Sequence, residues 1–261
     1  MDRIYSWGFH TSYRFGKGID VAISSESTLI QMIEEQHSKY NTGSLVWYAA
    51  YGSNLQRKRF ICYLEGGAPP NALSDALPLP KCDAGTEIRG DKPFLLGFKL
   101  YFADETSRTW GDGGVAFVGI QPVRPFPTRG RAYLLTVPQF ICVAKEENGG
   151  SHPVVITNKM LSTSAGATHE ITTDHQGRYR VLLVCGSINE IPVVTLTGWP
   201  KETTEGRLPS KNYLKTIREG LHETYPDMSY SDIEKYLRAS LHETCSEMSN
   251  GDIEEYLRNS L

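Results

Sequence analysis

The stretch VWYAAYGSNLQRKRF, from Val46 to Phe60, decides how this chain is organised. It begins as an alternating apolar run with the β-branched and aromatic content of a buried strand. It breaks at Gly52, Ser53 and Asn54 and restarts as a charged, helix-like segment. Glycine accepts positive φ, and serine and asparagine cap helices. The stretch therefore predicts a strand, a sharp turn and a helix that begins near Leu55.

The predicted turn has two readings. Backbone N–H groups at a strand-to-helix corner converge with partial positive charge, which favours an anion or an oxyanion. Taken alone, Tyr51-Gly52-Ser53-Asn54 fits ordinary turn chemistry equally well. The basic run Arg57-Lys58-Arg59 also has two interpretations. It either attracts an anionic substrate or is the solvated face of a helix.

Composition is that of an ordinary soluble globular protein. Of the 261 residues, 39% are hydrophobic and 22% are charged, which is enough to bury a full core. The formal net charge of -3 argues against a general nucleic-acid binder. The N-terminus lacks a continuous apolar segment of signal-peptide length, and no window approaches about eighteen uninterrupted apolar residues. We therefore expect a protein that is neither secreted nor inserted in a membrane.

The five cysteines are scattered and include no C-x-x-C pair. Their spacing predicts neither a disulfide framework nor a zinc site, and a reducing cytoplasm is the simplest location. Cys142 is expected in the core, with a nucleophilic role as the alternative. The histidines show no H-E-x-x-H spacing, Ser53 lies outside a G-x-S-x-G motif, and no G-x-x-x-x-G-K-[ST] loop is present. A metal hydrolase, a serine hydrolase and a P-loop nucleotidase are thus disfavoured.

Three segments follow from the pattern. Residues 1–44 are expected to form an N-terminal extension with one amphipathic helix over about residues 25–40, and residues 45–220 form the main domain. Its strands predict an α+β fold with a mixed or antiparallel sheet or a small barrel. Helices are expected at Gln56–Glu65 and Pro138–Glu147, and residues 66–91 form a long surface loop. Strands are expected at Val46–Tyr51, Phe94–Phe102, Val115–Ile120, Gly130–Thr136, Val154–Thr157, Tyr179–Cys185 and Val193–Leu196.

The third segment, residues 221–261, carries a tandem 20-residue helical repeat. Residues 221–240 and 241–260 agree at thirteen of twenty positions without a gap. In both copies Ile, Tyr, Leu and Leu recur at the spacing of one helix face. The duplicated helix either packs on the domain or hangs from it, or it presents a face for a protein partner or for self-association.

Four motifs lie in a fixed order over about residues 45–220. They are Tyr48-Ala49-Ala50-Tyr51-Gly52-Ser53-Asn54-Leu55, Ser107-Arg108-Thr109-Trp110 with Gly113-Gly114-Val115-Ala116, Gly130-Arg131-Ala132-Tyr133-Leu134-Leu135, and Pro209-Ser210-Lys211-Asn212-Tyr213-Leu214. This ordered set resembles the γ-glutamylcyclotransferase-like family, whose first motif is Y-F-A-Y-G-S-N-L. The resemblance implies a small mixed β-barrel flanked by helices.

The same resemblance implies the site. In the family a catalytic glutamate follows the third motif by a short helix, in L-D-x-x-E-G, and residue-by-residue matching assigns that role to Glu147. Asn148 replaces the usual glycine, so Glu146 remains the alternative, and both carboxylates equally suit a solvated helix end. Tyr213 is either a substrate contact or a core aromatic. The implied substrate contacts are Tyr48, Ala49, Ala50, Tyr51, Gly52, Ser53 and Tyr213.

The implied activity is a cofactor-independent cyclotransferase for a small γ-glutamyl substrate, with no metal. Glu147 would take a proton from the α-amino group and return it to the leaving nitrogen, which releases 5-oxoproline and an amine or amino acid. The alternatives are a non-catalytic binding protein on the same scaffold, which works through the repeat, and a related amidohydrolase, which releases a free acid. No nucleic-acid or membrane partner is expected.

Overall fold

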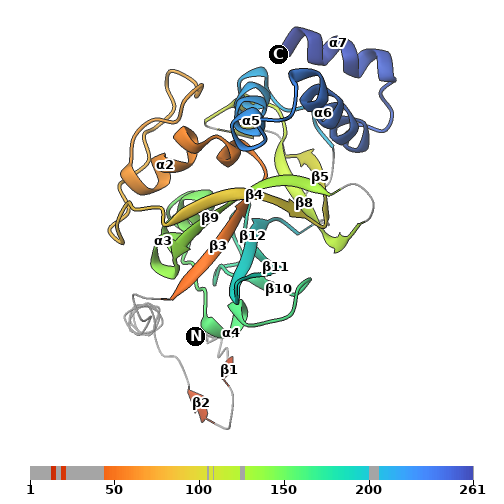
Figure 1. Ribbon diagram of the computed structural model, residues 1–261. Helices are drawn as coiled ribbons and strands as arrows, with labels where there is room; N and C mark the ends of the chain where they lie inside the picture. Colours follow the sequence, from red (N-terminus) through yellow and green to blue (C-terminus); the bar gives the residue numbers. More distant parts are fainter. Residues whose placement is uncertain are drawn as a thin grey trace, which may run out of the picture. The chain divides into compact units, whose positions relative to one another are not determined.

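Figure 1 shows the computed structural model, which describes residues 13–15, 19–21, 44–104, 106–107, 109–123, 127–199 and 206–260. The chain divides into two units, Met1–Asn41 and Thr42–Leu261. In the first unit β1 (Tyr13–Phe15) pairs antiparallel with β2 (Ile19–Val21). The helix expected over residues 25–40 lies outside the described residues.

A six-stranded mixed sheet organises the second unit, in the order β10-β11-β12-β3-β9-β4. Strand β3 runs parallel to β12 and antiparallel to β9, and the other neighbours are antiparallel. The prediction of an α+β fold with a mixed sheet is confirmed. The strands are β3 (Leu45–Ala50), β4 (Gly90–Leu96), β9 (Thr128–Thr136), β10 (Thr168–Glu170), β11 (Val181–Ile188) and β12 (Ile191–Thr197).

Strand β3 lies inside this sheet and is buried on both faces. Successive side chains of a strand point to opposite faces. Trp47 and Ala49 belong to the main hydrophobic core. Tyr48 faces the other way, with its ring centroid 5.9 Å from that of Phe60 and 5.5 Å from that of Phe140. Because both faces are covered, the run is apolar throughout instead of alternating with polar residues.

The described strands do not close into the expected barrel. The predicted strand Phe94–Phe102 is divided at Gly97, after which β5 (Phe98–Ala103) pairs with β8 (Val115–Pro122) in a separate two-stranded sheet. Between β8 and β12 the described residues show a side-chain link rather than a ladder, because the Thr197 hydroxyl donates to the Val118 carbonyl at 2.7 Å. The short strands β6 (Thr106–Ser107) and β7 (Gly111–Asp112) pair with each other.

The strand expected at residues 154–157 is also not formed. Val154 makes a single isolated bridge with Thr172. One apolar stretch of four residues is too short to tell a strand from a buried loop by its pattern.

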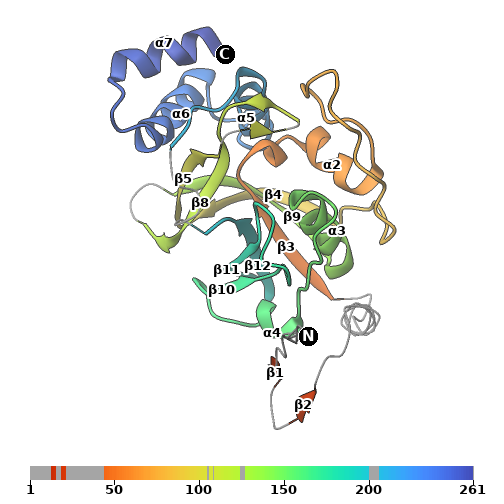
Figure 2. The same cartoon turned by 180° about the vertical axis from the view of Figure 1, so that it is seen from behind.

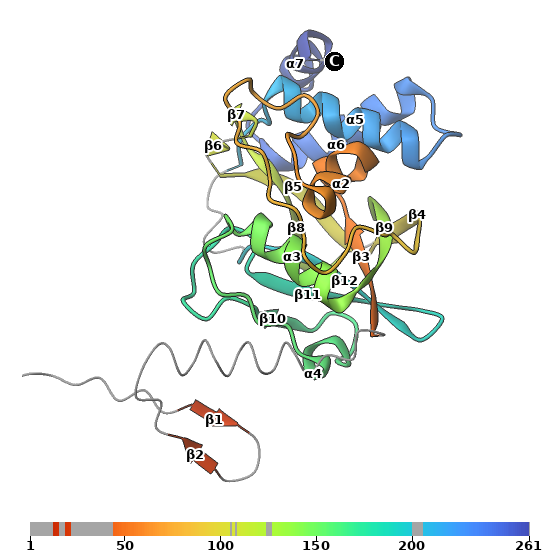
Figure 3. The same ribbon diagram turned by 90° about the vertical axis from the view of Figure 1, so that its left-hand side faces the viewer.

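Helices pack against the six-stranded sheet and against the two-stranded sheet of β5 and β8. In α3, Thr136 and Gln139 form a capping box, and Pro138 stands in the first turn, which explains why this helix was predictable. Figures 1, 2 and 3 show α5, α6 and α7 gathered on the side of β5 and β8, away from α4. The helices are the short 3-10 helix η1 (Ser53–Leu55), α2 (Arg57–Glu65), α3 (Val137–Glu147), α4 (Asn158–Leu161), α5 (Lys211–Thr224), α6 (Tyr230–Thr244) and α7 (Asn250–Ser260). None of the described helices has the length and apolarity needed to cross a membrane.

The helices of the repeated segment pack on the domain. Ile233 of α6 and Ile253 of α7 are fully buried in the main core. The Tyr236 hydroxyl accepts the backbone N–H of Arg129 at 3.0 Å, which fastens α6 to β9. The Tyr256 hydroxyl of α7 donates to the carbonyl of Pro209. Of the two structural readings, a packed and a hanging helix, the packed one describes α6 and α7.

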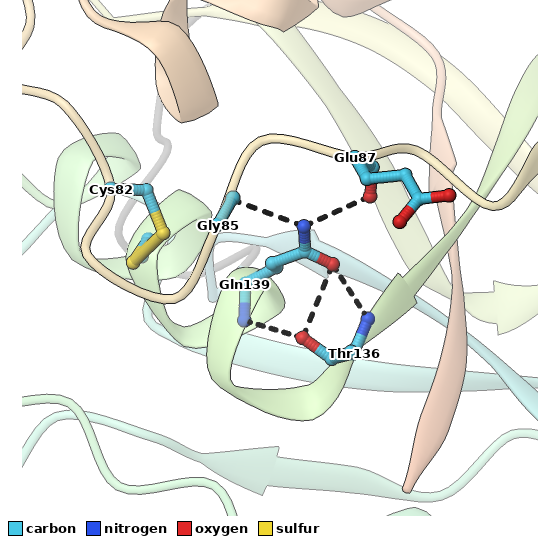
Figure 4. Close-up of a disulfide and its surroundings, with 6 residues drawn as sticks. Cys82, Gly85, Glu87, Thr136 and Gln139 are labelled. Atoms are coloured by element: carbon cyan, nitrogen blue, oxygen red, sulfur yellow. Dashed lines mark hydrogen bonds between the residues drawn. A yellow bond between two sulfur atoms is a disulfide. The ribbon is translucent and has the colours of Figure 1, made fainter. Parts of the chain in front are cut away.

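A disulfide joins Cys82 to Cys142, whose Cα atoms are 5.9 Å apart (Figure 4). The expectation that the cysteines form no disulfide was wrong for this pair, because the two cysteines are separated by 60 residues and carry no spacing signal. In the fold the loop over residues 66–89 runs back to α3. The Gln139 side chain donates to the carbonyls of Gly85 at 3.1 Å and Glu87 at 2.9 Å, and so holds the same loop.

Candidate functional site

A cavity of about 510 Å³ collects residues from distant parts of the second unit. The family resemblance implies eight site residues, and six of them line this cavity. The other two, Ala49 and Ala50, are buried in β3 and do not line it. The loop over residues 66–89 contributes Leu79. The six are Tyr48, Tyr51, Gly52, Ser53, Glu147 and Tyr213.

The corner after β3 is joined to the end of α3 by a hydrogen bond between side chains. Asn54 Nδ2 donates to Glu147 Oε1 at 2.6 Å and lies 3.2 Å from the Tyr48 hydroxyl. Asn54 is therefore not the helix cap that its position suggested, and α2 begins after Gln56 without a side-chain cap. Since Glu147 is the last residue of α3, the bond brings together two segments 93 residues apart in sequence.

The neighbouring carboxylate occupies a different place. Glu146 also lines the cavity, and its carboxylate lies near Gly150. Burial raises the pKa of Glu146; Lys145 opposes this shift, and the charge of Glu147 adds to it. The Asn54 amide is bonded to Glu147, so the two adjacent carboxylates are not equivalent in this structure.

Asn148, which occupies the position where the family has glycine, stabilises the end of α3. Its side chain is buried and donates to the carbonyls of Ala144 at 2.8 Å and Tyr179 at 3.2 Å. Its Oδ1 accepts the backbone N–H of Tyr179 at 2.9 Å. The end of α3, and with it Glu147, is thereby tied to the segment that leads into β11.

The four motifs meet around the corner. The Tyr133 hydroxyl of the third motif donates to the Asn54 carbonyl at 2.8 Å. The Tyr213 hydroxyl of the fourth accepts the backbone N–H of Ala116, from the second, at 3.1 Å. Burial raises the pKa of Tyr213 to about 12, so the phenol remains protonated at neutral pH. Tyr213 is thus a buried aromatic whose hydroxyl borders the cavity.

Glycine at position 52 is explained by close approach rather than by a positive φ. The φ of Gly52 is -106°, which other residues also adopt, so the expectation that this turn needs positive φ was wrong. A Cβ at this position would lie 2.7 Å from the Tyr213 hydroxyl oxygen and 3.2 Å from the Ala116 Cβ. The corner has no room for a side chain.

Among the residues of the cavity wall, Asn54 and Tyr63 were not assigned to the site by sequence reasoning, and Arg59 belonged to the basic run whose role was left open. The basic run divides in the structure. Arg57 pairs with Asp91 at 2.6 Å and Lys58 is exposed, but Arg59 is only 5% exposed. The helical period was a usable signal, because it puts Arg59 and Tyr63 on one face of α2.

Comparison with known proteins gives a few partial matches. No protein-family model matches the sequence. Histone deacetylase 5 of Arabidopsis thaliana is 28% identical over 194 residues, or 68% of this chain, and the chain spans only 28% of that relative's length. A solved structure titled "Gamma-glutamyl cyclotransferase" is similar at a TM-score of 0.42 and 20% identity, covering 74% of this chain and 86% of that chain. An uncharacterized protein from Homo sapiens is similar at a TM-score of 0.41 and 21% identity, over the same shares.

The surroundings of Glu147 are rich in buried phenols. Burial raises the pKa of Tyr48 and of Tyr63 well above the usual range; the Glu147 charge raises both further, and Arg59 opposes it. Both phenols therefore stay protonated at neutral pH. In the described part of the chain no three His, Cys, Asp or Glu side chains gather as a metal site would require. The site thus offers the Glu147 carboxylate beside buried phenols and the Arg59 guanidinium.

Proposed function

We propose that the chain is a cofactor-independent γ-glutamylcyclotransferase, which cleaves a γ-glutamyl amide by ring closure and releases 5-oxoproline and an amine or amino acid. The observation that carries this proposal is the 2.6 Å hydrogen bond between Asn54 Nδ2 and Glu147 Oε1. It holds a carboxylate at the corner that follows β3, inside a cavity large enough for a small-molecule substrate. The ordered motifs of the sequence support the same assignment.

The proposed reaction needs one proton carrier. Glu147 accepts a proton from the substrate's α-ammonium group, and the freed amine attacks the γ-carbonyl carbon of the same molecule. The tetrahedral intermediate places negative charge on the carbonyl oxygen, which the backbone N–H group of Gly52 stabilises, while the backbone N–H of Ser53 interacts with the Tyr213 hydroxyl. Glu147 then gives its proton to the amide nitrogen as the C–N bond breaks, and it takes the second proton that the attacking nitrogen must lose. That proton passes to the released amine, which leaves as an ammonium ion, so the proton balance closes without a cofactor.

Positioning supplies much of the acceleration in this scheme. Attack within one molecule avoids the entropy loss of bringing two reactants together. The cavity has to keep the glutamyl chain folded so that its amine faces its own carbonyl. Tyr48, Tyr51 and Tyr213 form rigid, buried walls for this purpose. Tyr51 is fixed because its hydroxyl donates to the Leu196 carbonyl at 2.6 Å.

The test is product analysis by mass spectrometry after incubation with a panel of γ-glutamyl peptides and amines. We expect 5-oxoproline in stoichiometric amount with the released amine, and a fall in kcat of about 10²- to 10⁴-fold for Glu147→Gln. Glu146→Gln tests the register, because it keeps Glu147 and should retain turnover. An activity that survives Glu147→Gln would show that this mechanism is wrong.

The alternative functions give different outcomes in the same assay. A related amidohydrolase releases free glutamate instead of the lactam. A non-catalytic binding protein gives no product and leaves the substrate unchanged. Localisation is tested separately. A cytoplasmic location stays a prediction, although the Cys82–Cys142 disulfide removes the absence of disulfides on which it rested. The redox state of these two cysteines in cells checks it, because a reducing compartment keeps thiols from pairing.

A further inference from the structure

Two polar side chains of the cavity wall contain buried atoms without a hydrogen-bond partner. These atoms are Oδ1 of Asn54 and the Nε and Nη1 nitrogens of Arg59. The orientation of the Asn54 amide follows from its neighbour, since a carboxylate can only accept and Nδ2 must therefore face Glu147. The cavity wall consequently holds one unused acceptor and two unused donors.

Leaving such groups unpaired is unfavourable. A buried polar group without a partner destabilises a fold, and a buried charge without one destabilises it more strongly. Among the described residues Arg59 has no carboxylate within ion-pair distance, and its hydrogen bond goes from Nη2 to the Tyr63 hydroxyl at 2.6 Å. Its guanidinium carbon lies 4.3 Å from the Tyr63 ring centroid and 6.0 Å from that of Trp110. These rings hold the cation in place without neutralising it.

The other basic side chains of the wall contrast with Arg59, because each has an acidic partner. Arg178 is paired with Asp104, and His152 lies 2.7 Å from an oxygen of Asp174. Arg59 is thus a cation for which a bound anion can act as the missing partner.

We propose that Asn54, Glu147 and Arg59 form a subsite for the head group of a free α-amino acid. The α-ammonium group donates to Asn54 Oδ1 and Glu147, and the α-carboxylate accepts from Arg59. This inference rests on the proposed function, which puts the α-amine at Glu147. The amine and the carboxylate are bonded to one carbon, so an amine at Glu147 brings the carboxylate beside it, where the same cavity wall presents Arg59.

The subsite restricts the substrate class. It selects γ-glutamyl compounds whose α-amino and α-carboxylate groups are both free, and it disfavours those with an α-amide or an α-ester. With the carboxylate on Arg59, the backbone N–H group of Gly52 does not have to bind it and is left for the γ-carbonyl oxygen. The leaving group makes no contact with these three residues.

The test compares two ligands on the full chain, with Glu147→Gln used to prevent turnover. One is γ-glutamylalanine, and the other is the same dipeptide with a carboxamide in place of the glutamyl α-carboxylate. Calorimetry should show the carboxylate form bound about 30-fold or more tightly. Adding Arg59→Met should remove this preference by weakening only the carboxylate form, whereas Arg59→Lys should keep part of it. Lys58→Met, one exposed charge removed from the same helix, is the matched control and should change neither affinity.

Several results would overturn the subsite. They are equal affinity for the two ligands, binding of neither, or equal weakening of both by Arg59→Met in a protein whose circular dichroism is unchanged. If Arg59→Met does not fold, the affinities of the two ligands for the protein with Arg59 and with Arg59→Lys test the subsite instead. Failure of the proposed function looks different, because selective carboxylate binding would then persist in a wild-type protein that makes no 5-oxoproline. Equal kcat/KM on both dipeptides would instead retain the activity and reject the subsite.

Discussion

The hydroxyl oxygen of Tyr213 lies 2.7 Å from the position that the Cβ atom of any other residue would occupy at Gly52. Substitution Gly52→Ala should therefore displace Tyr213, lower the free energy of unfolding by about 1–3 kcal/mol and reduce kcat/KM. Urea denaturation and product assays measure the two effects.

A double variant checks the cause. In Gly52→Ala combined with Tyr213→Phe the clashing oxygen is gone, so the stability losses should be smaller than the sum of the single losses. Tyr213→Phe alone should destabilise the protein, because the Ala116 N–H loses its acceptor. Additive losses would contradict the contact as the cause.

Asn54→Ala removes the amide that holds Glu147. We expect kcat to fall by about 10²-fold, since small misplacement of a catalytic group has effects of this size. Circular dichroism should still show a folded chain. Asn158→Ala, at an exposed position in the first turn of α4, is the control and should leave kcat unchanged. A kcat of Asn54→Ala equal to that of the wild type would argue against the positioning role.

Reduction of the Cys82–Cys142 disulfide should destabilise the protein. Chain entropy alone predicts about 4 kcal/mol for a closed loop of this length, given the separation of 60 residues. The measurement is urea denaturation with and without a thiol reductant. The double variant Cys82→Ser with Cys142→Ser should be less stable and should no longer respond to the reductant. If the wild type is also insensitive, the bond does not constrain the unfolded chain as expected.

The repeated helices should contribute to global stability. Ile233 and Ile253 occupy equivalent positions of the repeat and are both fully buried, so each change to alanine should destabilise the protein by about 2–4 kcal/mol. The exposed Glu255 provides a control, and Glu255→Ala should change stability by less than about 0.5 kcal/mol. A loss near zero for Ile253→Ala would indicate that α7 does not pack in solution.

Local pattern was sufficient for much of the fold. Neighbouring residues alone determine the apolar run of β3, the capping residues of α3 and the charged face of α2. Those elements lie within a few residues of their predicted bounds. Pattern was insufficient where a long-range contact decides. Gly97 divides one predicted strand in two, and the barrel remains open, because strand pairing depends on partners far along the chain.

The candidate site shows the same division. By itself the sequence determined the strand and the turn around Gly52 and carried the family resemblance that points to Glu147. Only the tertiary structure decided that Asn54 bonds to Glu147 instead of capping a helix. It also decided that Arg59 is buried and that Cys82 meets Cys142. The physical reason is that hydrogen bonds, burial and disulfides depend on distances in space, which residues so far apart in sequence acquire only when the chain is folded.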